Sequence, residues 1–207
     1  GSMYSGHRDA GAVELARHAR YSEGERALER AVAIQARHAD EVPARERGEL
    51  ITQLADWYLI FDDWNEAFET YQRARRVMID GGLEPERVAA MFDEPFPLVL
   101  PLPKRTGQSS MGGRRRPREG SITIEYDVNE RGQVRDVNIV ESQPEGVIDF
   151  RVRKAMRAAR FRPRFEDGEA VAADNVRYEH TFRYFEEPEK TEQTAGDNDD
   201  ASPTAGA

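Results

Sequence analysis

The chain has 207 residues, of which 38% are hydrophobic and 33% charged, with a net charge of −9 and no cysteine. This length allows one or two domains with buried cores, and the lack of cysteine excludes disulfides, thiol nucleophiles and cysteine-ligated metals. A protein dedicated to nucleic-acid duplexes is normally basic, so we expect no nucleic-acid partner. The longest strongly apolar run, residues 96–102, falls far short of the about 20 residues that cross a membrane, so we expect no membrane span.

Charge is unevenly spread along the chain. Residues 1–103 carry 12 basic and 19 acidic side chains, whereas residues 104–118 carry six basic and no acidic ones. Residues 119–185 carry 11 basic and 13 acidic side chains, and residues 186–207 carry one and seven. The pattern predicts a modular chain whose acidic tail, without core-forming residues, is disordered.

The first 80 residues show the apolar spacing of paired amphipathic helices. The positions that share a helical face are Ala27, Leu28, Ala31, Val32, Ile34, Leu50, Leu54, Trp57, Tyr58, Phe61, Ala67, Tyr71, Ala74 and Met78. Pro43 predicts the break between the second and third of these helices.

The boundaries of the next helix are predicted by local signals. Asp63 and Glu66 resemble a capping box, so a helix is expected to begin near Trp64. Gly81-Gly82 should end it, and a short helix is expected over residues 85–91.

Residues 93–118 show no periodicity and are rich in proline and arginine, which predicts a linker with an extended path. Its apolar first half, residues 96–102, is expected to dock on a neighbouring surface, because a fully solvated linker has no need of such side chains. The run Arg114 to Arg118 has two interpretations that stay open. In the first, the arginines contact phosphates, anionic lipids or an acidic partner. In the second, the run is a solvated joint.

From residue 119 the apolar period changes from helical to alternating. The expected elements are a strand over 121–128, a turn at 129–132, a strand over 134–141, a helix capped by Asp149 that runs to about Arg160 and closes before Pro163, and a strand over 176–185. The charged residues of this helix are expected on a solvated face; they are Arg151, Arg153, Lys154 and Arg157. This order predicts a small antiparallel sheet with one packed helix, and the whole chain is expected to be α+β.

The helical half resembles a tetratricopeptide repeat through the spacing of its large and small residues. The matching positions are Leu54, Ala55, Tyr58, Ala67, Tyr71 and Ala74. Residues 27–34 resemble the second helix of an earlier, more divergent repeat. The aromatic residues Trp57, Tyr58, Phe61 and Trp64 either pack the helix pairs or line a concave groove for a peptide.

Residues 119–184 resemble the C-terminal domain of the TonB family. The resemblance rests on Glu119-Gly120, the strand 121–128, Gly132, Val134, Val137 to Val140, Ser142, Ala155-Met156, Arg160-Phe161, Pro163 and the alternating last strand. The expected organisation is a tetratricopeptide-like domain over residues 1–92, a linker over 93–118, a TonB-like domain over 119–185 and a disordered tail over 186–207.

The sequence offers no catalytic constellation. Its four histidines, His7, His18, His38 and His180, lack metal-ligand spacing, so we expect no enzyme, no cofactor and no metal site. The resemblance implies a non-enzymatic transport or energy-transduction adaptor of the periplasm that binds a protein or peptide, such as an outer-membrane receptor. Residues 1–3 are typical of a cloning scar, so an inner-membrane anchor or signal peptide is expected outside this sequence.

The resemblance also implies that the last strand captures an extended partner segment by strand addition. The residues assigned to this site are Val176, Arg177, Tyr178, Glu179, His180, Thr181, Phe182 and Arg183. Residues 96–102 or a second copy of the chain, as in a homodimer, are alternative occupants of this edge. The alternative function is a periplasmic interaction scaffold whose helical repeats recruit a client.

Overall fold

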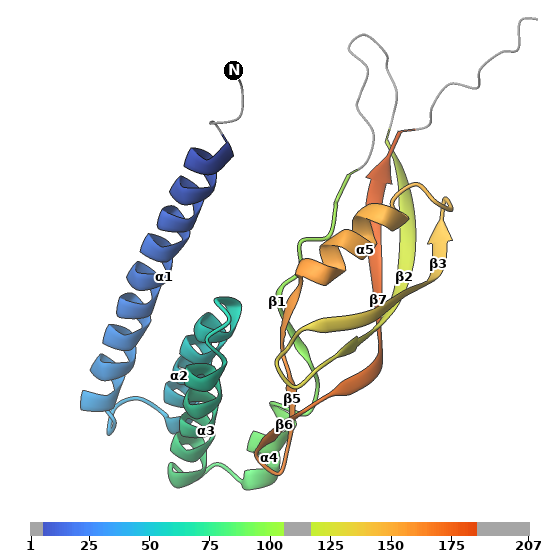
Figure 1. The fold of residues 1–207 in the computed structure, drawn as a ribbon. Helices are drawn as coiled ribbons and strands as arrows, with labels where there is room; N and C mark the ends of the chain where they lie inside the picture. The colour runs from blue at the N-terminus through green and yellow to red at the C-terminus, as the bar shows by residue number, and fades with distance from the viewer. Residues whose placement is uncertain (1–5, 106–116, 186–207) are drawn as a thin grey trace, which may run out of the picture.

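A computed structural model of the chain describes residues 6–105 and 117–185, with the side chains of α1 described at Ala19 and from residue 21 onward. The helical part contains α1 (Gly6–Arg37), α2 (Ala44–Ile60), α3 (Trp64–Asp80) and α4 (Pro85–Ala90), as Figure 1 shows. The remaining elements are β1 (Phe96–Val99), β2 (Arg118–Val128), β3 (Val134–Gln143), α5 (Asp149–Ala158), β4 (Arg160–Arg162), β5 (Arg164–Glu166), β6 (Glu169–Val171) and β7 (Ala173–Tyr184). The α+β fold class is confirmed. The acidic tail and Arg114 to Arg116 lie outside the described residues.

The helix α1 is continuous, so the expected extra helix before Pro43 is wrong: Pro43 separates the first helix from the second. Gly24 lies inside α1, although glycine is a poor helix former. Because it has no Cβ, the indole of Trp57 on α2 can pack directly against the backbone of α1 at this position. A Cβ at position 24 would lie 2.1 Å from Cζ2 of Trp57. Close contact with α2 therefore requires glycine at this position of α1.

The helices α2 and α3 pack against each other through small and aromatic residues. Ala55, Ala67, Tyr71 and Ala74 are completely buried between them, together with Met78. The helix α3 begins at Trp64 as predicted, but the predicted capping bond is absent: the N-cap residue Asp63 has no side-chain bond to the helix. Its carboxylate instead accepts a hydrogen bond from the Tyr21 hydroxyl at 3.4 Å.

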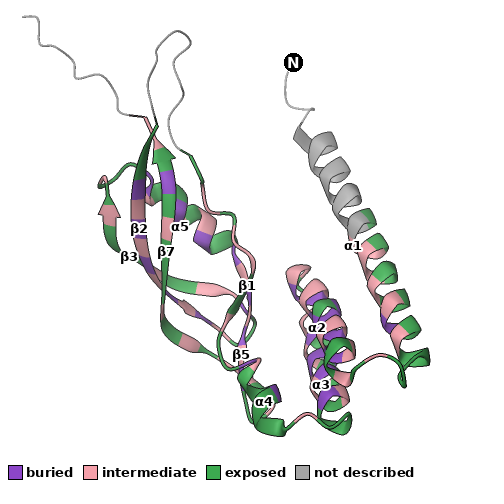
Figure 2. Cartoon of the chain, turned by 180° about the vertical axis from the view of Figure 1, so that it is seen from behind, coloured by how far each residue is buried: buried purple, intermediate pink, exposed green. Residues whose placement is uncertain are grey.

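The main sheet has the strand order β3-β2-β7, all antiparallel, and α5 crosses one face (Figure 1). The alternating residues of β2 form its buried face, namely Ile122, Ile124, Tyr126 and Val128. Val152 and Met156 of α5 are also buried in this core. Figure 2 shows the buried positions along β2, while β7 is mostly exposed or intermediate.

Two predictions for α5 are wrong. Ile148, not Asp149, is the N-cap, and the Asp149 carboxylate accepts a hydrogen bond from the Ser142 hydroxyl at 2.8 Å. The helix also ends earlier than expected, because Ala159 is extended and buried and Arg160–Arg162 form β4.

The segment expected to be a linker contains β1, which pairs antiparallel with β4. Phe96 is opposite Arg162, and Pro97 is opposite Phe161. Leu98 packs against the helical core, whereas Leu100 and Leu102 pack against the core of the sheet. The apolar first half of this segment therefore docks on both parts of the molecule, as expected for residues 96–102.

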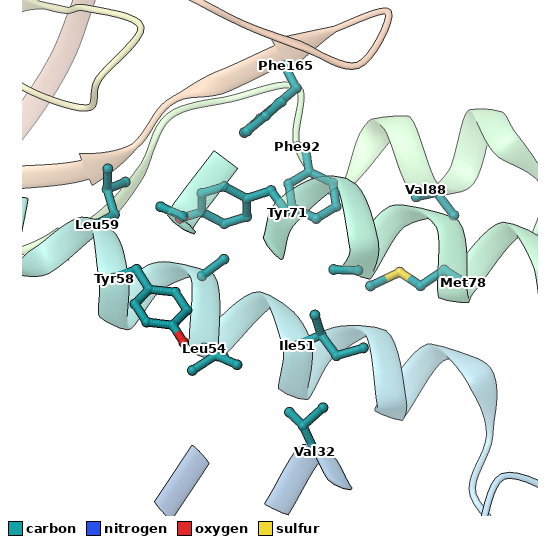
Figure 3. Packing of buried hydrophobic residues seen from close by; sticks show 13 residues of the cluster. Val32, Ile51, Leu54, Tyr58, Leu59, Tyr71, Met78, Val88, Phe92 and Phe165 are labelled. Carbon is teal, nitrogen blue, oxygen red and sulfur yellow. The ribbon is translucent and has the colours of Figure 1, made fainter. Parts of the chain in front are cut away.

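The hairpin of β5 and β6 brings an aromatic residue of the sheet half into the helical core. Phe165 is 5% exposed, and its ring centroid lies 5.3 Å from that of Tyr71 and 5.8 Å from that of Phe92 (Figure 3). The Phe165 N–H donates to the Phe92 carbonyl at 2.7 Å. The helices and the sheet half thus share buried side chains.

A largely buried ion pair lies beside this aromatic cluster. Arg162 of β4 donates to both carboxylate oxygens of Asp56 on α2, and the Tyr71 hydroxyl donates to the same carboxylate at 2.6 Å. The Arg162 guanidinium also lies 5.0 Å from the centroid of the Phe96 ring. Burial by itself would lower the pKa of Arg162, but the hydrogen bonds and charge of Asp56 raise it. These contacts fix β4 and β1 against α2.

Candidate partner-binding edge

The strand β7 is paired on one side with β2 over most of its length. The pairing is regular from Arg118 opposite Tyr184 to Tyr126 opposite Val176, and it shifts only beyond Tyr126. The other side of β7 faces the segment that follows β1, as Figure 1 shows. This side is the edge to which the sequence assigned partner binding.

The direction of the backbone groups along this edge follows from one hydrogen bond. The Arg183 N–H donates to the Lys104 carbonyl at 3.0 Å, so it points away from β2. Backbone groups in a strand alternate in direction, and the pairing is regular here, so those of Thr181, Glu179 and Arg177 point the same way. Within residues 6–105 and 117–185, no backbone partner covers this side of β7 from Arg177 to Thr181.

The upper end of the edge is occupied by residues 103–105 of the same chain. The Pro103 carbonyl lies 2.9 Å from Nε2 of His180, and Arg105 forms a parallel bridge with Arg183. The Arg105 carbonyl accepts a hydrogen bond from Nη1 of Arg151 on α5 at 3.0 Å. We call residues 100–105 the edge segment.

A hollow of about 530 Å³ lies where the edge segment meets β7. Its lining residues are Lys104, Arg105, Glu119, His180, Thr181, Phe182 and Arg183. Lys104, Arg105 and Arg183 are basic, and Glu119 is the acidic member. The hollow is bordered by β7 backbone groups and by these charged side chains.

The predicted site residues divide between the two faces of β7. Phe182 is buried in the sheet core, Val176 packs against that core, and Tyr178 is 37% exposed. On the opposite face Arg177 is exposed, and its Nε donates to Oε2 of Glu125 at 2.9 Å. Glu179, Thr181 and Arg183 on this face are also exposed. The alternation predicted for this strand is therefore present.

The outer edge of β3, at the opposite side of the sheet, is irregular. Its pairing with β2 shifts once where Val140 is inserted opposite the step from Thr123 to Ile124, and again near Asp136, which has a φ of 49°. Such irregularities twist an edge and prevent further pairing. The β7 edge, in contrast, is regular from Val176 to Tyr184.

The aromatic residues predicted as a possible groove lie mainly between α1 and α2. Trp57 Nε1 donates to the Tyr21 carbonyl at 3.2 Å, and the Phe61 ring centroid lies 4.9 Å from that of Trp57. Tyr58 is 6% exposed; burial first, and then Glu29, raise the pKa of its hydroxyl. Trp64 packs against Phe68 on α3. Of these four side chains, Tyr58 is buried and Trp57, Phe61 and Trp64 are partly exposed.

Two parts of the site have no signal in the sequence analysis. Arg151 is exposed, as expected, but it also donates to the Arg105 carbonyl of the edge segment, and Arg153 on the same helix donates to the Val137 carbonyl at 3.0 Å. The contacts of residues 103–105 use main-chain carbonyls, which every sequence has. Lys104 and Arg105, which follow the apolar run, are a local signal for this segment, but they do not predict that it lies beside β7.

The described residues contain no group of histidine and acidic side chains arranged to hold a metal ion. Among the helices with described residues, none is both long enough and apolar enough to cross a membrane.

The comparison with protein families decides the identity of this part of the chain. Residues 112–184 match the family described as the Gram-negative bacterial TonB protein C-terminal. Through these residues the chain belongs to the TonB C-terminal family. A search of curated proteins finds no match.

A solved structure with this family name also matches, the solution NMR structure of the Pseudomonas aeruginosa TonB C-terminal domain. It shares 30% sequence identity with the chain, with a TM-score of 0.29, and the match covers 47% of this chain and 89% of the other. TonB C-terminal domains are non-enzymatic interaction modules of the Gram-negative periplasm that bind envelope proteins such as outer-membrane receptors. The family thus implies a protein-interaction role in envelope transport for this chain.

Proposed function

We propose that the chain is a TonB-like envelope adaptor that binds an extended segment of a partner protein by pairing it with the edge of β7. The observation that carries this proposal is a row of backbone groups at Arg177, Glu179 and Thr181, on a regular strand, that no backbone of the described residues covers. In strand addition, main-chain hydrogen bonds supply affinity and alternate side chains supply specificity. The irregular outer edge of β3 is a poorer acceptor, which supports β7 as the binding edge.

The side chains beside this edge restrict the kind of segment that fits. A partner strand would place alternate side chains next to Tyr178 and His180 on the face toward α5, and the others next to Glu179 and Thr181. Tyr178 is partly exposed there and can be covered by an apolar residue. We therefore expect a segment with apolar residues at every second position and polar residues between them.

Overlapping synthetic peptides that cover the periplasmic segments of outer-membrane receptors test this proposal. Binding is measured by fluorescence anisotropy and located by the backbone amide shifts of the labelled chain. We expect a binding peptide to shift the amides of residues 176–183. Thr181→Pro removes an outward N–H and should lower affinity about tenfold or more, whereas Thr181→Ala keeps the N–H and should bind almost as wild type.

Both variants must first be shown to fold, by circular dichroism and thermal unfolding. A folded Thr181→Pro variant that binds every peptide with wild-type affinity would place recognition elsewhere on the molecule.

The scaffold that recruits a client through its helices is the second candidate. The observation that favours it is a hollow of about 540 Å³ on α3, beside Gly168 of the β5–β6 turn. Its lining residues are Glu66, Phe68, Glu69, Thr70, Gln72, Arg73 and Arg76. Arg73→Glu, which reverses a charge in this lining, should abolish client binding if this surface is used and leave peptide binding at β7 unchanged.

A further inference from the structure

The edge segment is held beside β7 by three consecutive main-chain carbonyls. The Pro103 carbonyl faces the His180 ring, the Lys104 carbonyl accepts from the Arg183 N–H, and the Arg105 carbonyl accepts from Arg151. The donors come from both β7 and α5, so this end of the edge is built to receive an extended backbone.

The side chains of residues 104 and 105 take little part in this attachment. Lys104 and Arg105 are both exposed, and their polar contacts with β7 and α5 are made by the main chain. An extended peptide of another sequence can offer the same carbonyls to the same donors. The attachment of residues 103–105 therefore resembles that of an added strand.

The preceding residues of the segment are anchored differently. Leu100 and Leu102 are partly buried against the sheet core, and β1 is fixed by its pairing with β4. Residues 103–105 can thus detach from β7 without disturbing either core, because their contacts are hydrogen bonds near the surface. Elements with few buried apolar contacts open at lower free energy than the core.

A partner strand that extends to the end of β7 needs the Arg183 N–H, which the Lys104 carbonyl already holds. We propose that residues 103–105 are an internal occupant of the end of the β7 edge that must leave before a partner strand can pair as far as Arg183, so that the free chain is self-inhibited at this end. This inference rests on the proposed function, since it concerns the regulation of the same edge.

A reversible lock tests the inference directly. Arg105 and Arg183 are bridge partners on adjacent backbones, and adjacent strands lie about 4.8 Å apart, within the range that a disulfide spans. The chain has no cysteine, so the variant R105C/R183C contains a single possible pair. Oxidation closes the lock, and a reductant opens it in the same protein.

A matched control keeps the edge segment free. In T123C/E141C the disulfide joins β2 to β3, whose residues 123 and 141 are directly opposite, and neither of them lies on β7. The probe is the tightest receptor peptide found on the wild-type chain. We expect oxidised R105C/R183C to bind it about tenfold or more weakly than the reduced form, and both forms of T123C/E141C to bind alike.

Hydrogen exchange in the free chain gives a second readout that needs no peptide. The Arg183 amide, bonded only to the edge segment, should exchange faster than the Phe182 amide, which faces β2. Equal exchange at the two positions would show that the segment does not open, and would overturn the inference.

The binding experiment separates this inference from the proposed function. A peptide that binds β7 equally well in the locked and reduced forms overturns the inference and leaves strand addition in place. If no peptide shifts the β7 amides in any form, strand addition fails and the inference fails with it.

Discussion

Arg162 donates two hydrogen bonds to Asp56, 106 positions earlier in the chain, from Nε at 2.9 Å and from Nη2 at 2.7 Å. Both side chains are only 14% exposed, so the pair lies largely away from water between α2 and β4. The same carboxylate accepts the Tyr71 hydroxyl, which ties the α2–α3 pair to this contact. The ion pair therefore holds the helices and the sheet half in one arrangement.

Asp56→Ala should destabilise the chain strongly, because it leaves the Arg162 guanidinium buried without a counter-charge. Loss of one partner of a buried pair costs about 3–5 kcal/mol. Glu49→Ala is the control, since Glu49 is paired with Arg45 at the surface and its loss should cost about 0–1 kcal/mol. Urea denaturation measures both, and equal small costs would contradict the role given to this contact.

Phe165→Ala tests whether the helical core depends on the sheet half. Phe165 is buried among Tyr71, Phe92 and Phe68, so its truncation should cost about 3–5 kcal/mol. Phe150→Ala is a matched control in the same half, because Phe150 is 78% exposed and its truncation should change the free energy of unfolding by less than about 0.5 kcal/mol.

The signal for this experiment is the fluorescence of Trp57 and Trp64, which lie in the helical half. Separate domains over residues 1–92 and 119–185 would leave the unfolding of the helices unchanged in Phe165→Ala. A shared core predicts that the helical signal is lost at a lower urea concentration.

The local patterns of the sequence were sufficient to predict most elements, but not the contacts between the halves. Ile122 to Val128 alternate and form the buried strand β2, and Ala67, Tyr71 and Ala74 follow helical spacing and are buried. These patterns record which face is apolar. Asp56, in contrast, is one acid among many in an acidic helix, and nothing local distinguishes it from a solvated carboxylate.

The candidate edge was predicted only in part for a related physical reason. The alternation of Val176 to Phe182 predicts a strand, and a strand must have edges. The segment beside this edge is held by main-chain groups, which every sequence has, so the alternation does not show which segment lies there. Pro97 and Pro101 likewise predicted an extended path for residues 96–102. The pairing of β1 with β4 could not be predicted in this way, because it depends on the position of β4, which Arg162 holds against α2.

Alkaline pH should destabilise the chain through its buried tyrosines, and Tyr126 allows a clean test. Burial raises the pKa of Tyr126 from 10.0 to about 12, with a smaller contribution from Tyr178. Below pH 10 the hydroxyl is protonated in the folded and unfolded states, so its contribution to stability is complete. Between pH 10 and 12 only the unfolded state releases the proton, so the free energy of unfolding falls as pH rises. The contribution lost by pH 11 is about 1.4 kcal/mol.

Tyr126→Phe removes this loss and keeps the ring against Phe161, whose centroid lies 5.4 Å away. Urea denaturation at pH 9 and pH 11 should therefore show a smaller decrease for the variant than for the wild type, and parallel decreases would show that Tyr126 ionises freely in the folded chain.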